Sequence, residues 1–207
     1  MKKTLINWLG LLGIISFLSY TAAVIFSPLK YPNYDWKSGA VSDLSAANAP
    51  SLTLWNQLNS LYGVCGIVCC TLVCVFIKDK LNKTTRLGIY FFTIMNWISS
   101  VGYTIFPLSN SGYAGTFQDV MHVYVVTVAV VILSIASLIL IMIGGYKKRQ
   151  HVPLAICATI AFALMLIGAI GTGVAPKTVF GIFERFSVFS AAGFNAVLGV
   201  YLLIVKS

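Results

Sequence analysis

Residues 31–50, YPNYDWKSGAVSDLSAANAP, form the longest polar-rich interval in a chain that is otherwise a series of apolar spans. The interval contains two of the five acidic residues, Asp35 and Asp43, and includes the compact turn Ser42-Asp43-Leu44-Ser45. A connection between two membrane helices needs far fewer residues and simpler chemistry. We therefore expect this outer loop, with its flanks at 28–53, to cap an outward-facing polar pocket.

The composition places the chain in a membrane. Of its 207 residues 58% are hydrophobic and only 9% are charged, and the mean hydropathy is +0.90, whereas a soluble domain has about 25% charged residues. The net charge of +9 does not indicate a nucleic-acid partner, because the basic residues occur in short clusters between apolar spans, as membrane topology demands. Membrane lipids are the expected partners of a single domain, 1–207.

Six stretches have the roughly 20 apolar residues that a membrane-spanning helix requires. They are residues 5–26, 58–77, 87–106, 120–143, 152–174 and 186–205. The sequence therefore predicts an all-α fold, a polytopic bundle of six transmembrane helices. Aromatic residues near the outer ends of the spans are expected in an interfacial belt; they include Tyr20, Tyr31, Tyr34, Trp36 and Trp55.

The basic residues predict the orientation. With both termini in the cytoplasm, ten fall in inner segments: Lys2, Lys3, Lys78, Lys80, Lys83, Arg86, Lys147, Lys148, Arg149 and Lys206. Only four fall in outer segments: Lys30, Lys37, Lys177 and Arg185. This excess follows the positive-inside rule and predicts a multi-pass protein of the cytoplasmic membrane. Four of the five acids then lie outside, and only Asp79 lies inside.

Small and polar residues inside the spans indicate how the helices pack. Glycines permit close helix contacts in lipid: Gly10/Gly13, Gly63/Gly66, Gly144/Gly145, Gly168/Gly171/Gly173 and Gly193. Such faces could also form contacts between copies of the chain, so a homo-oligomer is a possible partner. Asn96 and Asn195 fall mid-span and should face the bundle interior, since unpaired amides in lipid cost several kcal/mol. They either bond to each other's helices or line a path for a ligand or ion.

The positions of the cysteines predict neither a disulfide nor a metal site. All five lie inside apolar spans, and the i,i+4 pairs are too far apart for easy bridging: Cys65, Cys69, Cys70, Cys74 and Cys157. A three-histidine metal site is excluded by number, because only His122 of the two histidines lies on the outer side. No metal site is predicted. We interpret His151, in the basic inner loop, as solvated.

Asp119 and His122 are the candidate catalytic residues. They stand at i and i+3 on the first turn of the fourth span, so they share a helix face. A carboxylate beside an imidazole can orient it for acid–base work. The alternative is structural: Thr116-Phe117-Gln118-Asp119 is a capping-box variant, and His122 would then be an interfacial histidine.

Asp43, Ser45, Glu184 and Arg185 are the candidate ligand-binding residues. Glu184 suits the positive N-terminal end of the sixth helix. Arg185 departs from the positive-inside trend, so we expect a partner for it, either Asp43, Asp119 or an anionic lipid headgroup. The structural alternatives are a surface ion pair at 184–185 and an Asx-type turn at 43–45. A serine hydrolase is weakly indicated, because no nucleophile-elbow motif is present.

Several of these motifs together resemble a known family. The 31–50 loop, the Ile105-Phe106-Pro107-Leu108-Ser109 segment, the Asp119/His122 pair and the GIFERF segment at 181–186 are similar to the bacterial and archaeal family called domain of unknown function 998. The resemblance covers nearly the whole chain. It implies a multi-span membrane protein and no particular activity.

A fainter resemblance concerns the first outer loop. Val41-Ser42-Asp43 followed by Pro50 is similar to the Ile-Ser-Asp…Pro loop of the Frag/DRAM/Sfk-type six-span proteins. That resemblance implies a link to lipid and GPI-anchor remodelling. The Thr-Gly that follows the aspartate in those proteins is replaced here by Leu44-Ser45.

These observations favour a protein that binds or modifies a lipid or lipid-linked headgroup in the outward-facing pocket. The first alternative is a small-molecule or ion transporter or channel, with Asn96 and Asn195 on the path. A charge at mid-depth, which is typical of transporters, is absent from the spans. The second alternative is a non-catalytic membrane sensor or assembly factor.

Overall fold

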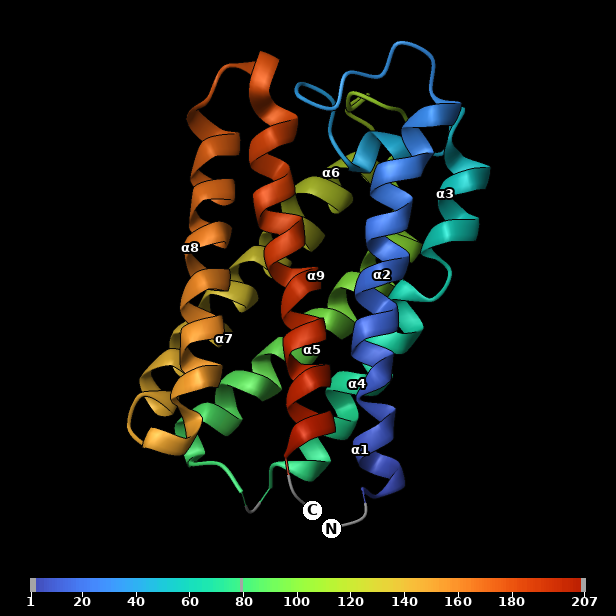
Figure 1. Cartoon of the computed structure of the whole chain (residues 1–207). Helices are drawn as coiled ribbons and strands as arrows, with labels where there is room; N and C mark the ends of the chain where they lie inside the picture. Colours follow the sequence, from blue (N-terminus) through green and yellow to red (C-terminus); the bar gives the residue numbers. More distant parts are fainter. Residues whose placement is uncertain (1–2, 79, 206–207) are drawn as a thin grey trace.

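The structure, a computed structural model, describes residues 3–78 and 80–205; Lys2, Asp79 and Lys206 lie outside these ranges. Within them the chain folds into helices and contains no strand (Figure 1). The helices are α1 Leu5–Leu9, α2 Leu11–Phe26, α3 Leu52–Asn59, α4 Tyr62–Phe76, α5 Lys83–Ile105, α6 Phe117–Val120, α7 Val128–Gly145, α8 Val152–Val174 and α9 Phe180–Ile204. A π-helical segment, Met121–Thr127, joins α6 to α7.

Among the described residues, five helical segments are long and apolar enough to cross a membrane: Leu5–Lys30, Leu52–Phe76, Phe117–Gly145, Arg149–Val174 and Lys177–Ile204. This confirms the predicted all-helical, membrane-embedded fold. The remaining long helix, α5, has 23 residues but is more polar, because it includes Asn96, Ser99 and Ser100 among its apolar residues.

The two ends of the bundle differ (Figure 1). At the terminal end lie the start of α1, the end of α9 and the α4–α5 and α7–α8 turns. Asn7 ties this end together, because its Nδ2 donates to the carbonyl oxygens of Leu202 at 2.8 Å and Val205 at 2.9 Å. The opposite end, here called the capped end, is covered by loop 1 (residues 31–51) and loop 2 (residues 106–116).

The second predicted span is interrupted. Its helix begins at Leu52, as α3, and breaks after Asn59 before α4 starts at Tyr62. On α2, the hydroxyls of Ser16 and Ser19 donate to the carbonyls of Tyr62 and Leu58, on either side of the break. Hydroxyls of a neighbouring helix thus bind backbone groups that lipid cannot solvate.

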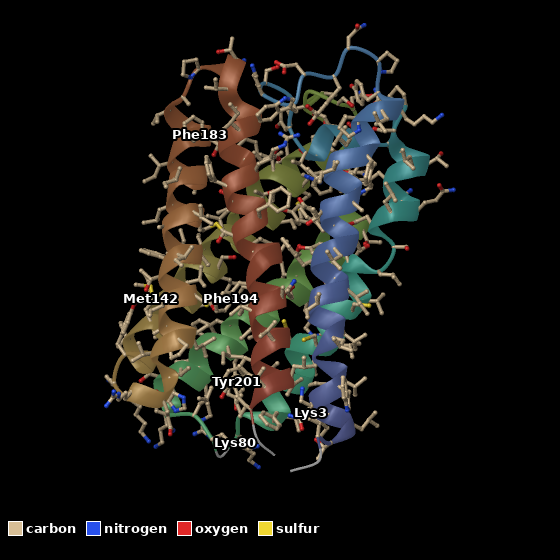
Figure 2. All side chains as sticks on the ribbon, in the orientation of Figure 1. Lys3, Lys80, Met142, Phe183, Phe194 and Tyr201 are labelled. Atoms are coloured by element: carbon tan, nitrogen blue, oxygen red, sulfur yellow. The ribbon has the colours of Figure 1, made fainter. Side chains whose placement is uncertain are left out.

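Most of the predicted glycine contacts form within the chain. A methyl group at Gly13 would lie 2.9 Å from the Gly199 Cα, and one at Gly168 would lie 2.5 Å from the Ser187 nitrogen. A methyl group at Gly171 would collide with the Phe183 ring, which Figure 2 shows near the capped end of α9. A methyl group at Gly173, in contrast, would meet nothing within 4 Å.

The centre of the bundle combines an apolar core with one polar pair. Phe92 and Phe194 meet edge-to-face at 5.0 Å, and Phe194 lies midway along α9 (Figure 2). The Asn195 Nδ2 donates to the Asn96 Oδ1 at 3.0 Å, and both residues are buried. The predicted interior position of the two asparagines is confirmed, and they bond to each other. All five cysteines are free thiols.

The predicted positions of three residues, His151, Tyr20 and Trp55, are wrong. His151 is buried rather than solvated, because it closes a 3₁₀ turn, Arg149–His151, directly at the start of α8. Tyr20 and Trp55 do not join an interfacial belt. They pack edge-to-face at 6.0 Å, both 7% exposed, in a core beneath loop 1.

Candidate functional site

Loop 1 is built from local turns. The carboxylate of Asp35 accepts hydrogen bonds from the Lys37 nitrogen at 3.1 Å and the Ser38 hydroxyl at 2.9 Å, and these bonds lower the pKa of Asp35. The hydroxyl of Tyr34 donates to the carbonyls of Gly39 and Ala40. Burial raises the pKa of this phenol to about 12, so Tyr34 stays protonated and able to donate.

Asp43 joins the two loops at the capped end. It lies in a 3₁₀ turn, Ser42–Ser45; its Oδ2 accepts from the Ala40 nitrogen at 3.0 Å and its Oδ1 accepts from the Gly112 nitrogen at 2.8 Å. Gly112 has a φ of +84°, which favours glycine. The Ser45 hydroxyl donates only within the turn, to the Ser42 carbonyl at 3.0 Å.

Asp119 closes loop 2. It is fully buried, and its carboxylate accepts four hydrogen bonds, from the Ser109 nitrogen and hydroxyl at 2.7 and 2.8 Å, the Ala114 nitrogen at 3.0 Å and the Thr116 nitrogen at 3.2 Å. The Thr116 hydroxyl in turn accepts from the Asp119 nitrogen. The predicted capping box is therefore present, and the carboxylate of Asp119 faces loop 2.

His122 is oriented by a backbone carbonyl. Its Nδ1 lies 2.8 Å from the Phe106 oxygen, and a carbonyl only accepts, so Nδ1 carries the proton and Nε2 of the neutral ring has a free lone pair. The ring packs on Tyr103 at 4.7 Å between centroids. Our expectation that Asp119 would orient the imidazole is wrong, since all four of its hydrogen bonds lie in loop 2 and its own cap.

His122 also lies in the π-helical segment. The Thr127 hydroxyl donates to the His122 carbonyl at 2.8 Å, and the Tyr103 hydroxyl lies 3.0 Å from the Thr127 hydroxyl. Because Thr127 already uses its proton, Tyr103 is the donor to it. π-Helical insertions occur frequently at functional sites.

Glu184 and Arg185 hold loop 1 against α9. The carboxylate of Glu184 accepts from the Val41 nitrogen. The Arg185 Nη1 donates to the carbonyls of Trp36 at 2.8 Å, Gly39 at 3.2 Å and its own-helix Gly181 at 2.8 Å; its Nη2 donates to the Tyr34 hydroxyl at 3.0 Å. The expected carboxylate partner for Arg185 is wrong, because these acceptors are carbonyl and hydroxyl oxygens.

The predicted site residues thus lie at the capped end of the bundle, and those with charged side chains are connected by hydrogen bonds to the backbone of loops 1 and 2. Asp43, Glu184 and Arg185 all bind the 36–41 segment of loop 1, while Asp43 and Asp119 both bind loop 2. Most of their capacity for hydrogen bonds is used to fix the loops. Arg185 has five N–H donors, and its Nε–H and one Nη2–H have no acceptor among the described residues.

An apolar groove lies beside Arg185. Its volume is about 360 Å³. It is lined by Trp36, Leu164, Ile182, Arg185, Phe186 and Phe189. Ile182, Phe186 and Phe189 stand at i, i+4 and i+7, so they form one stripe along α9. The guanidinium carbon of Arg185 lies 6.0 Å from the Trp36 ring. A cation therefore stands at the edge of an apolar groove.

Sequence reasoning missed the tyrosines and the backbone acceptors of this site. Tyr34 could have been proposed from the sequence, because it lies among the polar turn residues of loop 1. Tyr103 had no sequence signal beyond its position near the end of a predicted span. The Phe106 carbonyl could not be found, because a backbone acceptor has no sequence signature. Among residues 3–78 and 80–205, no group of three or more His, Cys, Asp or Glu is placed to hold a metal ion.

Comparison with known proteins gives a family and no activity. The chain belongs to the family described as "Protein of unknown function (DUF998)", whose model matches residues 14–201. No curated protein and no solved structure matches the chain.

Proposed function

We propose that this member of the DUF998 family is a multi-pass protein of the cell membrane that crosses it six times and binds an anionic lipid or lipid-linked headgroup at the capped end. Both termini are then cytoplasmic. Three observations support the parts of this proposal: the path of α5, the distribution of basic residues, and the groove beside Arg185.

The path of α5 supports the sixth crossing. α4 ends at the terminal end of the bundle, and α6 begins at the capped end (Figure 1). α5 connects them with 23 residues, about 35 Å at 1.5 Å per residue, which exceeds a hydrocarbon core of about 30 Å. Its polar residue Asn96 faces the bundle and is bonded, so it is not exposed to lipid.

The basic residues support the orientation. The α4–α5 turn and the α7–α8 turn, both at the terminal end, include Lys78, Lys80, Lys147, Lys148 and Arg149. Basic residues remain on the cytoplasmic side. The capped end, with loops 1 and 2, then faces outward.

The groove carries the proposal of a lipid ligand. Arginine recognises phosphate through paired N–H donors, and Arg185 keeps its Nε–H and one Nη2–H for such a group. Directly beside it, the stripe Ile182, Phe186 and Phe189 supplies an apolar surface for an acyl chain. The headgroup would bind at Arg185 and the chain would lie along α9. Modification of the lipid would further require the free Nε2 of His122 to reach the same headgroup.

Binding of defined lipids to the purified full-length protein tests this proposal. Native mass spectrometry should show phosphatidylglycerol retained more strongly than phosphatidylcholine, because only the first has net negative charge. Arg185→Gln should weaken retention about tenfold or more, and Lys177→Gln, an exposed cation at the same end, should leave it unchanged. Leu164→Trp narrows the groove from α8 and removes none of the hydrogen bonds that hold loop 1, and it should also weaken retention. Equal retention by all four proteins would refute the proposal.

The other functions lack an observation of their own. Asn96 and Asn195, the candidates for a transport path, bond to each other across the bundle, which supports a structural role for them. A sensor or assembly factor would need a partner surface, and most of the small-residue faces are used inside the chain. Lipid binding is therefore the function that the geometry favours.

A further inference from the structure

One face of α3, here called the α3 stripe, consists of polar residues. Thr53, Asn56, Gln57 and Ser60 follow the i, i+3, i+4 and i+7 spacing of a single helix face, and all four are exposed. The Ser60 hydroxyl donates to the Gln57 carbonyl at 2.9 Å. The side-chain amides of Asn56 and Gln57, in contrast, form no hydrogen bond with any residue that the structure describes. The α3 stripe therefore presents two complete amide groups to its surroundings.

The depth of α3 in the membrane follows from its contact with α2. The Ser19 hydroxyl of α2 donates to the Leu58 carbonyl of α3, so these two residues are level. Beside Ser19, Leu18 is 58% exposed. Ile25, six residues or about 9 Å nearer the capped end, is level with the start of α3 and is 57% exposed. α2 thus exposes apolar side chains over the whole height of α3.

α5 gives the same depth. A methyl group at Gly63, near the start of α4, would lie 2.6 Å from the Ser100 hydroxyl oxygen of α5, so these residues are level. Ile105, five residues nearer the capped end and therefore level with Leu58, is 59% exposed. Figure 1 shows α3 at the edge of the bundle, at a height that α8 and α9 also occupy. The α3 stripe therefore lies within the apolar belt of the protein, where lipid tails cannot bond to its amides.

The chemistry of the α3 stripe selects its partner. All four side chains are neutral, and each can both donate and accept hydrogen bonds. Two copies in one membrane have the same orientation, so a two-fold axis along the membrane normal brings each residue opposite its own counterpart. Amides and hydroxyls bond to their counterparts, whereas like charges would repel each other. A helix that lies among lipid headgroups is typically rich in Lys and Arg, and α3 has no charged residue.

We propose that the α3 stripe is an interface with the α3 stripe of a second copy of this chain, in which Asn56 and Gln57 bond to their counterparts. Asn and Gln side chains join transmembrane helices by interhelical hydrogen bonds. Thr53 and Ser60 extend the contact to the two ends of the stripe. The groove beside Arg185 is lined by loop 1, α8 and α9 and takes no part in this contact. The interface therefore does not depend on the lipid proposal.

Cysteine cross-linking in intact membranes tests the interface. Thr53→Cys and Ser60→Cys keep both amides, and a short bis-maleimide should convert at least one of these variants to a covalent dimer. The parent, whose five cysteines are buried or half-buried, sets the background. Ile170→Cys is the matched control, because Ile170 is 59% exposed near the same end of α8 and lies outside the stripe. Cross-linking of both stripe variants no stronger than that of Ile170→Cys would overturn the proposal.

A double leucine variant tests the two amides directly. Asn56→Leu with Gln57→Leu removes no hydrogen bond within the chain, so its circular dichroism spectrum should match that of the parent. Energy transfer between labelled copies in liposomes, measured over a range of protein-to-lipid ratios, should show the dissociation constant of the dimer raised at least tenfold. Thr172→Leu, which removes a hydroxyl that bonds only within α8, should dimerise as the parent does. A parent that is monomeric at every ratio, or a double leucine variant that dimerises equally well, would overturn the proposal.

Discussion

Glu184 and Arg185 are consecutive residues of α9, and they bind the backbone of loop 1 with opposite polarity. Glu184 accepts a hydrogen bond from the Val41 nitrogen, and Arg185 donates to the carbonyls of Trp36 and Gly39. Charged groups that bond to backbone are stronger partners than neutral ones. Loop 1 is therefore fixed to α9 at both ends of its 36–41 segment, and its position depends on α9 as much as on its own turns.

We expect Asp119 to stabilise the capped end strongly. Asp119→Ala removes a buried carboxylate that accepts four hydrogen bonds from Ser109, Ala114 and Thr116, so it should lower the free energy of unfolding by about 2–4 kcal/mol. Asp35→Ala is the matched control: its carboxylate bonds only to neighbouring residues of an exposed turn, and we expect no clear change in stability. Denaturant unfolding in detergent measures both. Equal effects would contradict the assigned role of Asp119.

Two glycines of α8 should respond oppositely to alanine. A methyl group at Gly168 would meet the Ser187 backbone, whereas one at Gly173 meets nothing within 4 Å. Gly168→Ala should destabilise the protein by about 1–3 kcal/mol, as overpacking does. Gly173→Ala should be neutral or stabilising by up to about 1 kcal/mol, because alanine is the better helix former. Thermal unfolding of the two variants side by side gives the comparison. A stabilised Gly168→Ala protein would show that α8 and α9 are not in the described contact.

The proposed topology makes a separate prediction. Reporter fusions after Lys80 and Lys148 should report cytoplasm, and those after Asn48 and Gly112 should report the outside, because the first pair lies in turns of the terminal end and the second in the capping loops. A phosphatase reporter active outside and a fluorescent reporter active inside give opposite signals at each position. An outside signal at Lys148 would contradict six crossings with cytoplasmic termini.

The sequence predicted what depends on length, apolarity and local spacing. The five apolar helices follow from hydrophobic runs, and the cap at Asp119 follows from a three-residue spacing. The interior position of Asn96 and Asn195 follows from the cost of leaving amides in lipid. These features need no knowledge of which helices are neighbours.

The features that were missed depend on partners distant in the chain. The break before Tyr62 is accompanied by serine hydroxyls of α2, and no local signal at residue 60 predicts it. Arg185 was expected to pair with a carboxylate, but loop 1 brings carbonyl oxygens to it. His151 looked solvated because its neighbours are basic, yet the turn before α8 buries its ring. In each case the structure depends on contacts between segments that are distant in the sequence.

The attachment of loop 1 should weaken at high pH. Burial raises the pKa of Tyr34 to about 12, while the phenol of an unfolded chain titrates near 10. The folded state holds this proton more tightly, so the stability linked to it is complete below about pH 10 and is lost as pH rises from about 10 to 12. The slope is at most about 1.4 kcal/mol per pH unit, and partial exposure of Tyr34 reduces it.

Tyr34→Phe isolates this titration from those of the other tyrosines. The variant lacks the hydroxyl that donates to Gly39 and Ala40 and accepts from Arg185, so at pH 8 it should be less stable than the parent by about 1–2 kcal/mol. Because it has no group to titrate at this position, its deficit should shrink as pH rises toward 12. Unfolding free energies of both proteins at pH 8, 10 and 11.5 give the difference directly. If the deficit stays constant over that range, the hydroxyl of Tyr34 is not held in the protonated, hydrogen-bonded form that fixes loop 1 to α9.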